Sequence, residues 1–287
     1  MLITIAGMIG GGKSSLTNLI SKEFGGNAYY EQADSPILQK FYTASQEELV
    51  SKRYPFLLQL EFLNSRFKMI KHCLIEGKNP KVNVLDRSIY EDKYFTLVNH
   101  RLGRISDEEM VIYNNLVDNM LEELEELPKK APDLLIYLKG SFETFKNRIE
   151  NRGRSFEALD EETEAYFYEL WKGYDEWVST CYKASPVLVI DIDYLDYVNS
   201  KEDAKKVVEI VRLKLKELNL LENEQPKGTL KVSGNISFTS IEELPEEVTV
   251  HPEEVAKENL LELFKSEILG GKENTEVKVN KFEMVLK

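Results

Sequence analysis

The sequence has few cysteines, few histidines and no long apolar run. Cys73 and Cys181 are too few for a disulfide framework, and neither they nor the three histidines have the spacing of a zinc site. No stretch approaches the ~20 apolar residues that a membrane helix needs. The first residues also lack the basic-then-apolar order of a signal peptide. We therefore expect a cytoplasmic protein without a membrane segment.

Positive charge is also scarce. The 287 residues contain 37 lysines and arginines against 50 aspartates and glutamates, which gives a net charge of −13. Such a chain is repelled by a nucleic-acid backbone, so polymeric DNA or RNA is excluded as its ligand. Local basic clusters can still bind a small anion such as ATP.

A glycine-rich loop follows the first apolar run of the chain. Residues 2–6 are apolar or β-branched, and residues 7–15 fit the pattern G-x-x-x-x-G-K-[ST]. In such a loop backbone N–H groups surround phosphate oxygens, Lys13 reaches the transferring phosphates and the Ser14 hydroxyl can ligate Mg²⁺. The pattern predicts a nucleoside triphosphate site formed by Gly7, Gly10, Gly11, Gly12, Lys13, Ser14 and Ser15.

Strand and helix patterns alternate after this loop. Strands are expected at 28–30, 81–85, 134–138 and 187–190, and residues 34–53 are expected to be irregular or broken helix. Long helices are expected at 55–76, 107–127, 142–151, 161–182 and 200–218. Another helix is expected to follow residues 86–88 and to end at about residue 102. This alternation predicts an α/β fold, with a five-stranded parallel sheet covered by helices on both faces.

The last part of the chain has a different pattern. Residues 1–221 are expected to form the main domain, and the polar stretch 222–228 is expected to be a linker. Residues 229–287 begin with the spacing of one leucine-rich-repeat unit, but a single repeat cannot bury its own apolar face. We therefore expect a small β/α appendage, packed on the main domain or on a partner subunit.

Several charged residues fall where a phosphoryl transferase needs them. Glu31 follows the second strand and can act as a general base, and Asp86 ends the third strand, where it can hold Mg²⁺ or cap the next helix. Arg148, Arg152 and Arg154 lie within seven positions, and a glycine separates the last two. They can form a mobile lid over the triphosphate, or merely a solvated basic face.

The helix at 55–76 offers a clue to the acceptor. Gln59 and Arg66 are two turns apart and share one face. A glutamine can pair with a nucleobase edge, and the arginine can hold a carboxylate that reads the base further along. Asp92, two turns after Asp86, is a candidate for that carboxylate.

Taken together, these segments resemble the deoxynucleoside kinase family, and especially its bacterial deoxyadenosine/deoxyguanosine branch. The similar segments, in family order over about residues 1–215, are 7–15, Glu31, 54–59 with Arg66, 86–92 and 148–157. The resemblance implies a P-loop kinase fold and a homodimer formed through a helix bundle. It also implies phosphorylation of the 5′-hydroxyl of a small-molecule deoxynucleoside by MgATP, the acceptor being a purine deoxynucleoside (deoxyadenosine or deoxyguanosine) or deoxycytidine.

The resemblance also implies roles for single residues. Glu31 matches the general base, and Arg87 matches the arginine beside the 5′ oxygen. The residues that match the nucleoside contacts are Gln59 for the base, Arg66 and Asp92 for discrimination against thymine, and Tyr42 with Glu157 for the sugar 3′-hydroxyl. The three lid arginines match as well. Catalysis would then depend on Lys13, Mg²⁺, Arg87 and the lid.

Two other functions also fit parts of the sequence. A nucleoside monophosphate kinase of the thymidylate type shares the loop, an Asp-Arg element and an arginine lid, but it needs cations for the acceptor's own phosphate. A nucleotide-binding interaction protein would use the segment at 229–287 as its working surface. Gln59, Arg66 and Asp92 favour an unphosphorylated nucleoside, and intact Lys13, Ser14 and Glu31 favour an enzyme.

Overall fold

The computed structural model describes residues 1–31, 35–76, 82–125, 131–154 and 160–221. Its centre is a sheet of five parallel strands in the order β2-β3-β1-β4-β5. The strands are β1 (Leu2–Gly7), β2 (Asn27–Tyr29), β3 (Asn83–Asp86), β4 (Leu134–Lys139) and β5 (Val187–Asp191). The five-stranded parallel sheet is therefore confirmed. The predicted linker 222–228, the appendage 229–287 and Glu157 lie outside the described residues.

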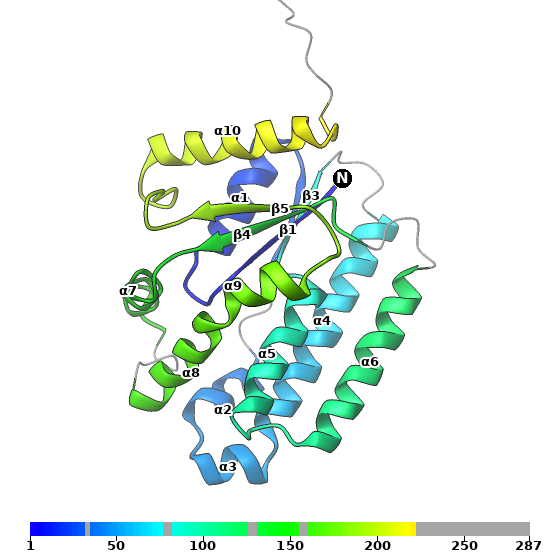
Figure 1. Cartoon of the computed structure of the whole chain (residues 1–287), viewed down its shortest axis with the longest axis vertical. Helices are drawn as coiled ribbons and strands as arrows, with labels where there is room; N and C mark the ends of the chain where they lie inside the picture. Colours follow the sequence, from blue (N-terminus) through cyan, green and yellow to red (C-terminus); the bar gives the residue numbers. More distant parts are fainter. Residues whose placement is uncertain (32–34, 77–81, 126–130, 155–159, 222–287) are drawn as a thin grey trace, which may run out of the picture. The chain divides into compact units, whose positions relative to one another are not determined.

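Helices cover both faces of the sheet (Figure 1). On one face, α1 (Lys13–Glu23) packs beside α10 (Lys201–Glu217). On the other face, α4 (Tyr54–Glu76), α5 (Ile89–Arg101), α6 (Asp107–Glu125) and α8 (Glu161–Lys172) form a second layer. Every residue of β1 and β3 is buried, as expected for parallel strands between two helical layers.

Most predicted element boundaries agree with the structure to within two residues. The expected broken helix at 34–53 is two short helices, α2 (Pro36–Thr43) and α3 (Gln46–Ser51), and Ser45 begins the second with a capping box. The helix predicted at 142–151 is α7 (Phe142–Arg152), which ends at Gly153 in a left-handed conformation (φ 66°). Ser200 caps α10 as expected, since its hydroxyl accepts the Asp203 N–H.

The prediction of one helix over residues 161–182 is wrong. The α8 helix ends at Lys172, a three-residue helix α9 (Tyr174–Glu176) follows, and residues Trp177–Cys181 form a π-helical turn (η2). The break is at Gly173, where a Cβ atom would lie 2.8 Å from the Tyr94 hydroxyl. Close packing of α8 against α5 therefore sets this boundary, and helical periodicity alone does not reveal it.

Among the described residues, no helix is both long enough and apolar enough to cross a membrane.

Candidate active site

The phosphate loop joins β1 to α1 at the edge of the sheet where the strands end. Gly10 and Gly12 have φ angles of 82° and 85°, a conformation that side chains with a Cβ disfavour. A Cβ at Gly12 would also lie 2.9 Å from the Tyr197 hydroxyl. The two glycines are thus required by both backbone conformation and packing, as expected for a loop that wraps around phosphates.

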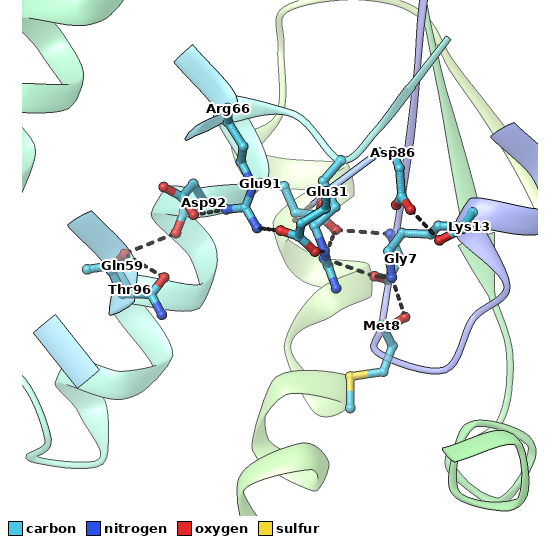
Figure 2. A network of polar contacts seen from close by, with 12 residues as sticks. Gly7, Met8, Lys13, Glu31, Gln59, Arg66, Asp86, Glu91, Asp92 and Thr96 are labelled. Atoms are coloured by element: carbon cyan, nitrogen blue, oxygen red, sulfur yellow. Dashed lines mark hydrogen bonds and ion pairs between the residues drawn. The ribbon is translucent and has the colours of Figure 1, made fainter. Parts of the chain in front are cut away.

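Lys13 is buried inside this loop. Its Nζ donates hydrogen bonds to the carbonyls of Gly7 (3.0 Å) and Met8 (2.8 Å) (Figure 2). Burial first, and the nearby Arg87 second, lower the pKa of Lys13 to about 7, although three neighbouring carboxylates act in the opposite direction. An anion bound in the loop would favour the charged form of this amine, which suits a phosphate-binding lysine.

Ser14 and Asp86 lie side by side, as predicted for a magnesium site. The Ser14 hydroxyl donates to Asp86 Oδ2 at 2.5 Å, and Asp86 Oδ1 is buried without a hydrogen-bond partner among the described residues. Asp86 does not cap the next helix, because α5 begins after Ser88. A hydroxyl and a carboxylate oxygen are ligands that Mg²⁺ accepts, so this pair fits the ion.

Glu31 lies just beyond β2, between two arginines. Its carboxylate is paired with Arg66 on one oxygen and lies 3.1 Å from Arg87 Nε on the other (Figure 2). Burial alone would raise the pKa of Glu31, but Arg66 and Arg87 hold it below its ordinary value. The side chain is therefore an ionised carboxylate at neutral pH.

The residues predicted to read the base lie on the far side of Arg66 from Glu31. Asp92 is fully buried on α5, pairs with Arg66 and accepts a hydrogen bond from the Tyr113 hydroxyl at 2.9 Å. Gln59 is buried on α4, and its carbonyl oxygen accepts a bond from Thr96 at 3.4 Å. Arg66 and Asp92 thus form the predicted pair, and Thr96, whose hydroxyl contacts both Gln59 and the Asp92 carbonyl, lies between Gln59 and that pair (Figure 2).

The three predicted lid arginines lie on or just after α7. Arg148 donates to the carbonyls of Gly11 (3.3 Å) and Ile192 (3.4 Å), so it contacts the phosphate loop directly. Desolvation and the neighbouring Arg154 lower the pKa of Arg152 to about 10. Arg148 therefore places a cation beside the loop, where it can neutralise a triphosphate.

Tyr42, the predicted sugar contact, is half-buried on α2. Its ring packs edge-on against Phe41 and Phe167, and burial raises the pKa of its hydroxyl. The charges of Glu31 and Arg87 also affect the pKa of this hydroxyl, so Tyr42 lies near the candidate base.

Three residues of the site are absent from the sequence-based prediction. Glu91 is fully buried and its Oε1 accepts the Gly7 N–H at 3.0 Å. The Tyr174 hydroxyl lies 3.1 Å from the same nitrogen, and the Tyr197 hydroxyl donates to the Gly11 carbonyl at 2.9 Å. Only Glu91 had a sequence signal, because it follows Arg87 by one helical turn.

Comparisons with known proteins find several similar enzymes. A family model described as deoxynucleoside kinase matches residues 3–216. The chain is 42% identical to a deoxyguanosine kinase of Lactobacillus johnsonii over 80% of this chain and 99% of that protein. It is 40% identical to a deoxyadenosine kinase of Lactobacillus acidophilus over 77% of this chain and 99% of that one.

A similar solved structure is the deoxyadenosine kinase of M. mycoides with bound dATP. The TM-score is 0.58 with 30% sequence identity, over 75% of this chain and all of that chain. The same enzyme has also been solved with bound dCTP.

Proposed function

The chain belongs to the deoxynucleoside kinase family and has its P-loop kinase fold, and we propose that it transfers the γ-phosphoryl group of MgATP to the 5′-hydroxyl of a deoxynucleoside. The preferred acceptor is a purine deoxynucleoside, since its relatives named above are deoxyguanosine and deoxyadenosine kinases. Deoxycytidine is the second acceptor class, because a related enzyme binds dCTP.

The observation that most favours this reaction is the position of Glu31. It is an ionised carboxylate held between Arg66 and Arg87. Arg66 also pairs with Asp92 of the proposed base site, and Arg87 also donates to the Gly7 carbonyl of the phosphate loop. A carboxylate at this point can accept the proton of a 5′-hydroxyl that attacks the γ-phosphorus. Glu31 is therefore the general base.

The rest of the chemistry is positioning and charge neutralisation. Lys13 and the loop amides would hold the triphosphate, and Arg87, next to Glu31, can stabilise the charge that develops between donor and acceptor oxygens. Ser14 and Asp86 would hold Mg²⁺, which neutralises phosphate charge when bound. Arg148, Arg152 and Arg154 supply further cations as a lid.

Base recognition is assigned to Gln59, Arg66 and Asp92. With its carbonyl oxygen accepting from Thr96, Gln59 can turn its amide N–H groups toward the base. The paired Arg66 and Asp92 add donors and an acceptor in a buried setting, where an unmatched polar group is costly. Tyr42 and Glu157 are assigned to the sugar 3′-hydroxyl.

The nucleoside monophosphate kinase is the weaker alternative. That activity needs cations for the acceptor's own phosphate, whereas the buried Gln59 and the paired Arg66 and Asp92 suit an unphosphorylated nucleoside. The named relatives are all deoxynucleoside kinases.

We also propose a homodimer that acts in the cytoplasm and returns free deoxynucleosides to the nucleotide pool. Val111, Ile112 and Leu116 lie on α6 with 59%, 51% and 37% of their surface exposed, which provides an apolar strip for helix packing between subunits. Cytoplasmic location is consistent with the use of ATP as the phosphate donor.

The deciding experiment is an assay of phosphorylation of the four deoxynucleosides and their monophosphates with MgATP. We expect turnover of deoxyguanosine, deoxyadenosine or both, and little turnover of thymidine or of any monophosphate. Turnover of monophosphates alone would refute the proposed acceptor.

A Glu31→Gln variant tests the base. It should lower kcat by about 10²- to 10⁴-fold. The KM for ATP should change little. Glu47→Gln, which alters an exposed glutamate of α3, is the matched control. Nearly normal kcat in Glu31→Gln would remove Glu31 from this role.

A further inference from the structure

Glu91 contacts both the phosphate loop and Arg87, the arginine assigned to the acceptor. Its Oε1 atom accepts the Gly7 N–H at 3.0 Å and lies 2.9 Å from Arg87 Nη1. The same Nη1 atom donates to the Gly7 carbonyl at 3.3 Å. Each of Gly7, Glu91 and Arg87 thus contacts the other two, and the contacts use both the N–H and the carbonyl of Gly7, the first glycine of the loop.

The burial of Glu91 indicates a role beyond packing. The side chain is fully buried, and its second oxygen, Oε2, has no hydrogen-bond partner among the described residues. Burying a carboxylate with one oxygen unsatisfied is unfavourable compared with an apolar residue of similar size. The contacts that compensate for this cost are those with the loop and with Arg87.

Arg87 in turn depends on these contacts. Its backbone has φ 76°, a left-handed conformation that is unfavourable for a residue with a Cβ. The side chain is held by Glu91, by Glu31 and by the Phe95 ring, whose centre lies 4.6 Å from the guanidinium carbon. Surrounding contacts therefore stabilise a strained residue next to the candidate base.

We propose that Glu91 is a positioning residue that couples nucleotide binding in the phosphate loop to the orientation of Arg87, and so to binding of the deoxynucleoside. This inference rests on the proposed function, since it takes the loop as the donor site and Arg87 as part of the acceptor site. A phosphate group that fixes the Gly7 peptide also fixes Glu91 Oε1, and the ordered carboxylate holds Arg87 in place for the 5′ end of the nucleoside. Coupling of this kind is reciprocal, so each ligand should tighten the binding of the other.

The test is a binding cycle on the full chain. Titration calorimetry would give the dissociation constants of deoxyguanosine and deoxyadenosine, with and without a non-hydrolysable ATP analogue and Mg²⁺. In the wild type we expect the analogue to tighten binding of the accepted nucleoside at least about fivefold. In Glu91→Gln, which keeps the size of the side chain but removes its charge, the ratio should fall to within about twofold of one.

A change in fold stability alone would not produce this pattern. An analogue that binds only the folded protein raises the folded fraction, so a destabilised variant would show a larger apparent ratio, not a smaller one. Glu47→Gln should keep the wild-type ratio. Glu91→Asp, which keeps the charge but is shorter by one methylene, should also lose the coupling and serves if Glu91→Gln does not fold.

Two results would overturn the proposal. One is a ratio near one in the wild type, and the other is an unchanged ratio in Glu91→Gln. Failure of every deoxynucleoside to bind or to be phosphorylated would instead refute the proposed function, so the two failures are distinguishable.

Discussion

Replacing Tyr113 by phenylalanine removes one buried hydroxyl from the base-reading end of the site. Tyr113 has no exposed surface, and its hydroxyl donates to Asp92 Oδ2 at 2.9 Å. Burial raises the pKa of Tyr113 to about 12, so the hydroxyl remains a donor across the physiological range. Phenylalanine keeps the ring and leaves no cavity, so the substitution isolates this hydrogen bond.

The expected cost follows from what is left behind. A hydrogen bond to a charged group contributes about 1.5 to 3 kcal/mol, and Asp92 is fully buried with Arg66 as its remaining ionic partner. We expect the free energy of unfolding to fall by about 2 kcal/mol. For a chain of this size that corresponds to a decrease in Tm of roughly 4 to 8 °C.

The functional consequence should be confined to the nucleoside. Without Tyr113 to hold it, Asp92 can rotate away from the geometry that aligns Arg66 for the base. We expect the KM for the accepted deoxynucleoside to rise about 3- to 10-fold, which corresponds to the loss of one hydrogen bond. The KM for ATP should stay within twofold of the wild type.

Thermal denaturation and steady-state kinetics of Tyr113→Phe and of Tyr168→Phe would check both expectations. Tyr168 is 43% exposed, so its substitution should change neither quantity. A Tyr113→Phe enzyme with wild-type Tm and wild-type KM for the nucleoside would refute the reasoning, because the buried carboxylate would then not need its donor.

Two further predictions concern the base and the loop. Arg66→Gln removes a cation that lowers the pKa of Glu31, so the acidic limb of the pH profile of kcat/KM should move to higher pH. An unchanged acidic limb would mean that the ionisation of Glu31 does not produce it. Tyr197→Phe removes one of two side-chain hydrogen bonds to the Gly11 carbonyl and leaves the longer one from Arg148. It should raise the KM for ATP about 3- to 10-fold with the nucleoside KM unchanged, and equal changes in both would contradict a role confined to the loop.

Local sequence signals predict the framework of the candidate site. The spacing of glycines, Lys13 and Ser14 predicts the phosphate loop because that loop is formed by consecutive residues. Gln59 and Arg66 face the site together because they are two turns apart on one helix. Glu31 and Asp86 follow strands whose ends meet at one edge of a parallel sheet.

Other features depend on contacts between distant segments. Tyr197 reaches Gly11 from 186 positions away, and Tyr174 reaches Gly7 from 167 positions away, so no local pattern indicates them. The break at Gly173 results from the approach of Tyr94 on another helix. Glu91 lay within a predicted helix, but only the tertiary structure shows that it faces the loop instead of solvent.

The order of charges in the site explains how an acidic protein can hold a triphosphate and an ionised base together. Three carboxylates and three cations alternate along the site as Asp92, Arg66, Glu31, Arg87, Glu91 and Lys13. With Asp86, which acts on Lys13, four carboxylates face three cations, so most of the buried charge is compensated locally although the whole chain carries −13. Because each carboxylate neutralises adjacent cations, no single member can be removed without leaving an uncompensated charge among its neighbours. The network is therefore a unit, in which the geometry of the base-reading end depends on the same pairs that orient the phosphate end.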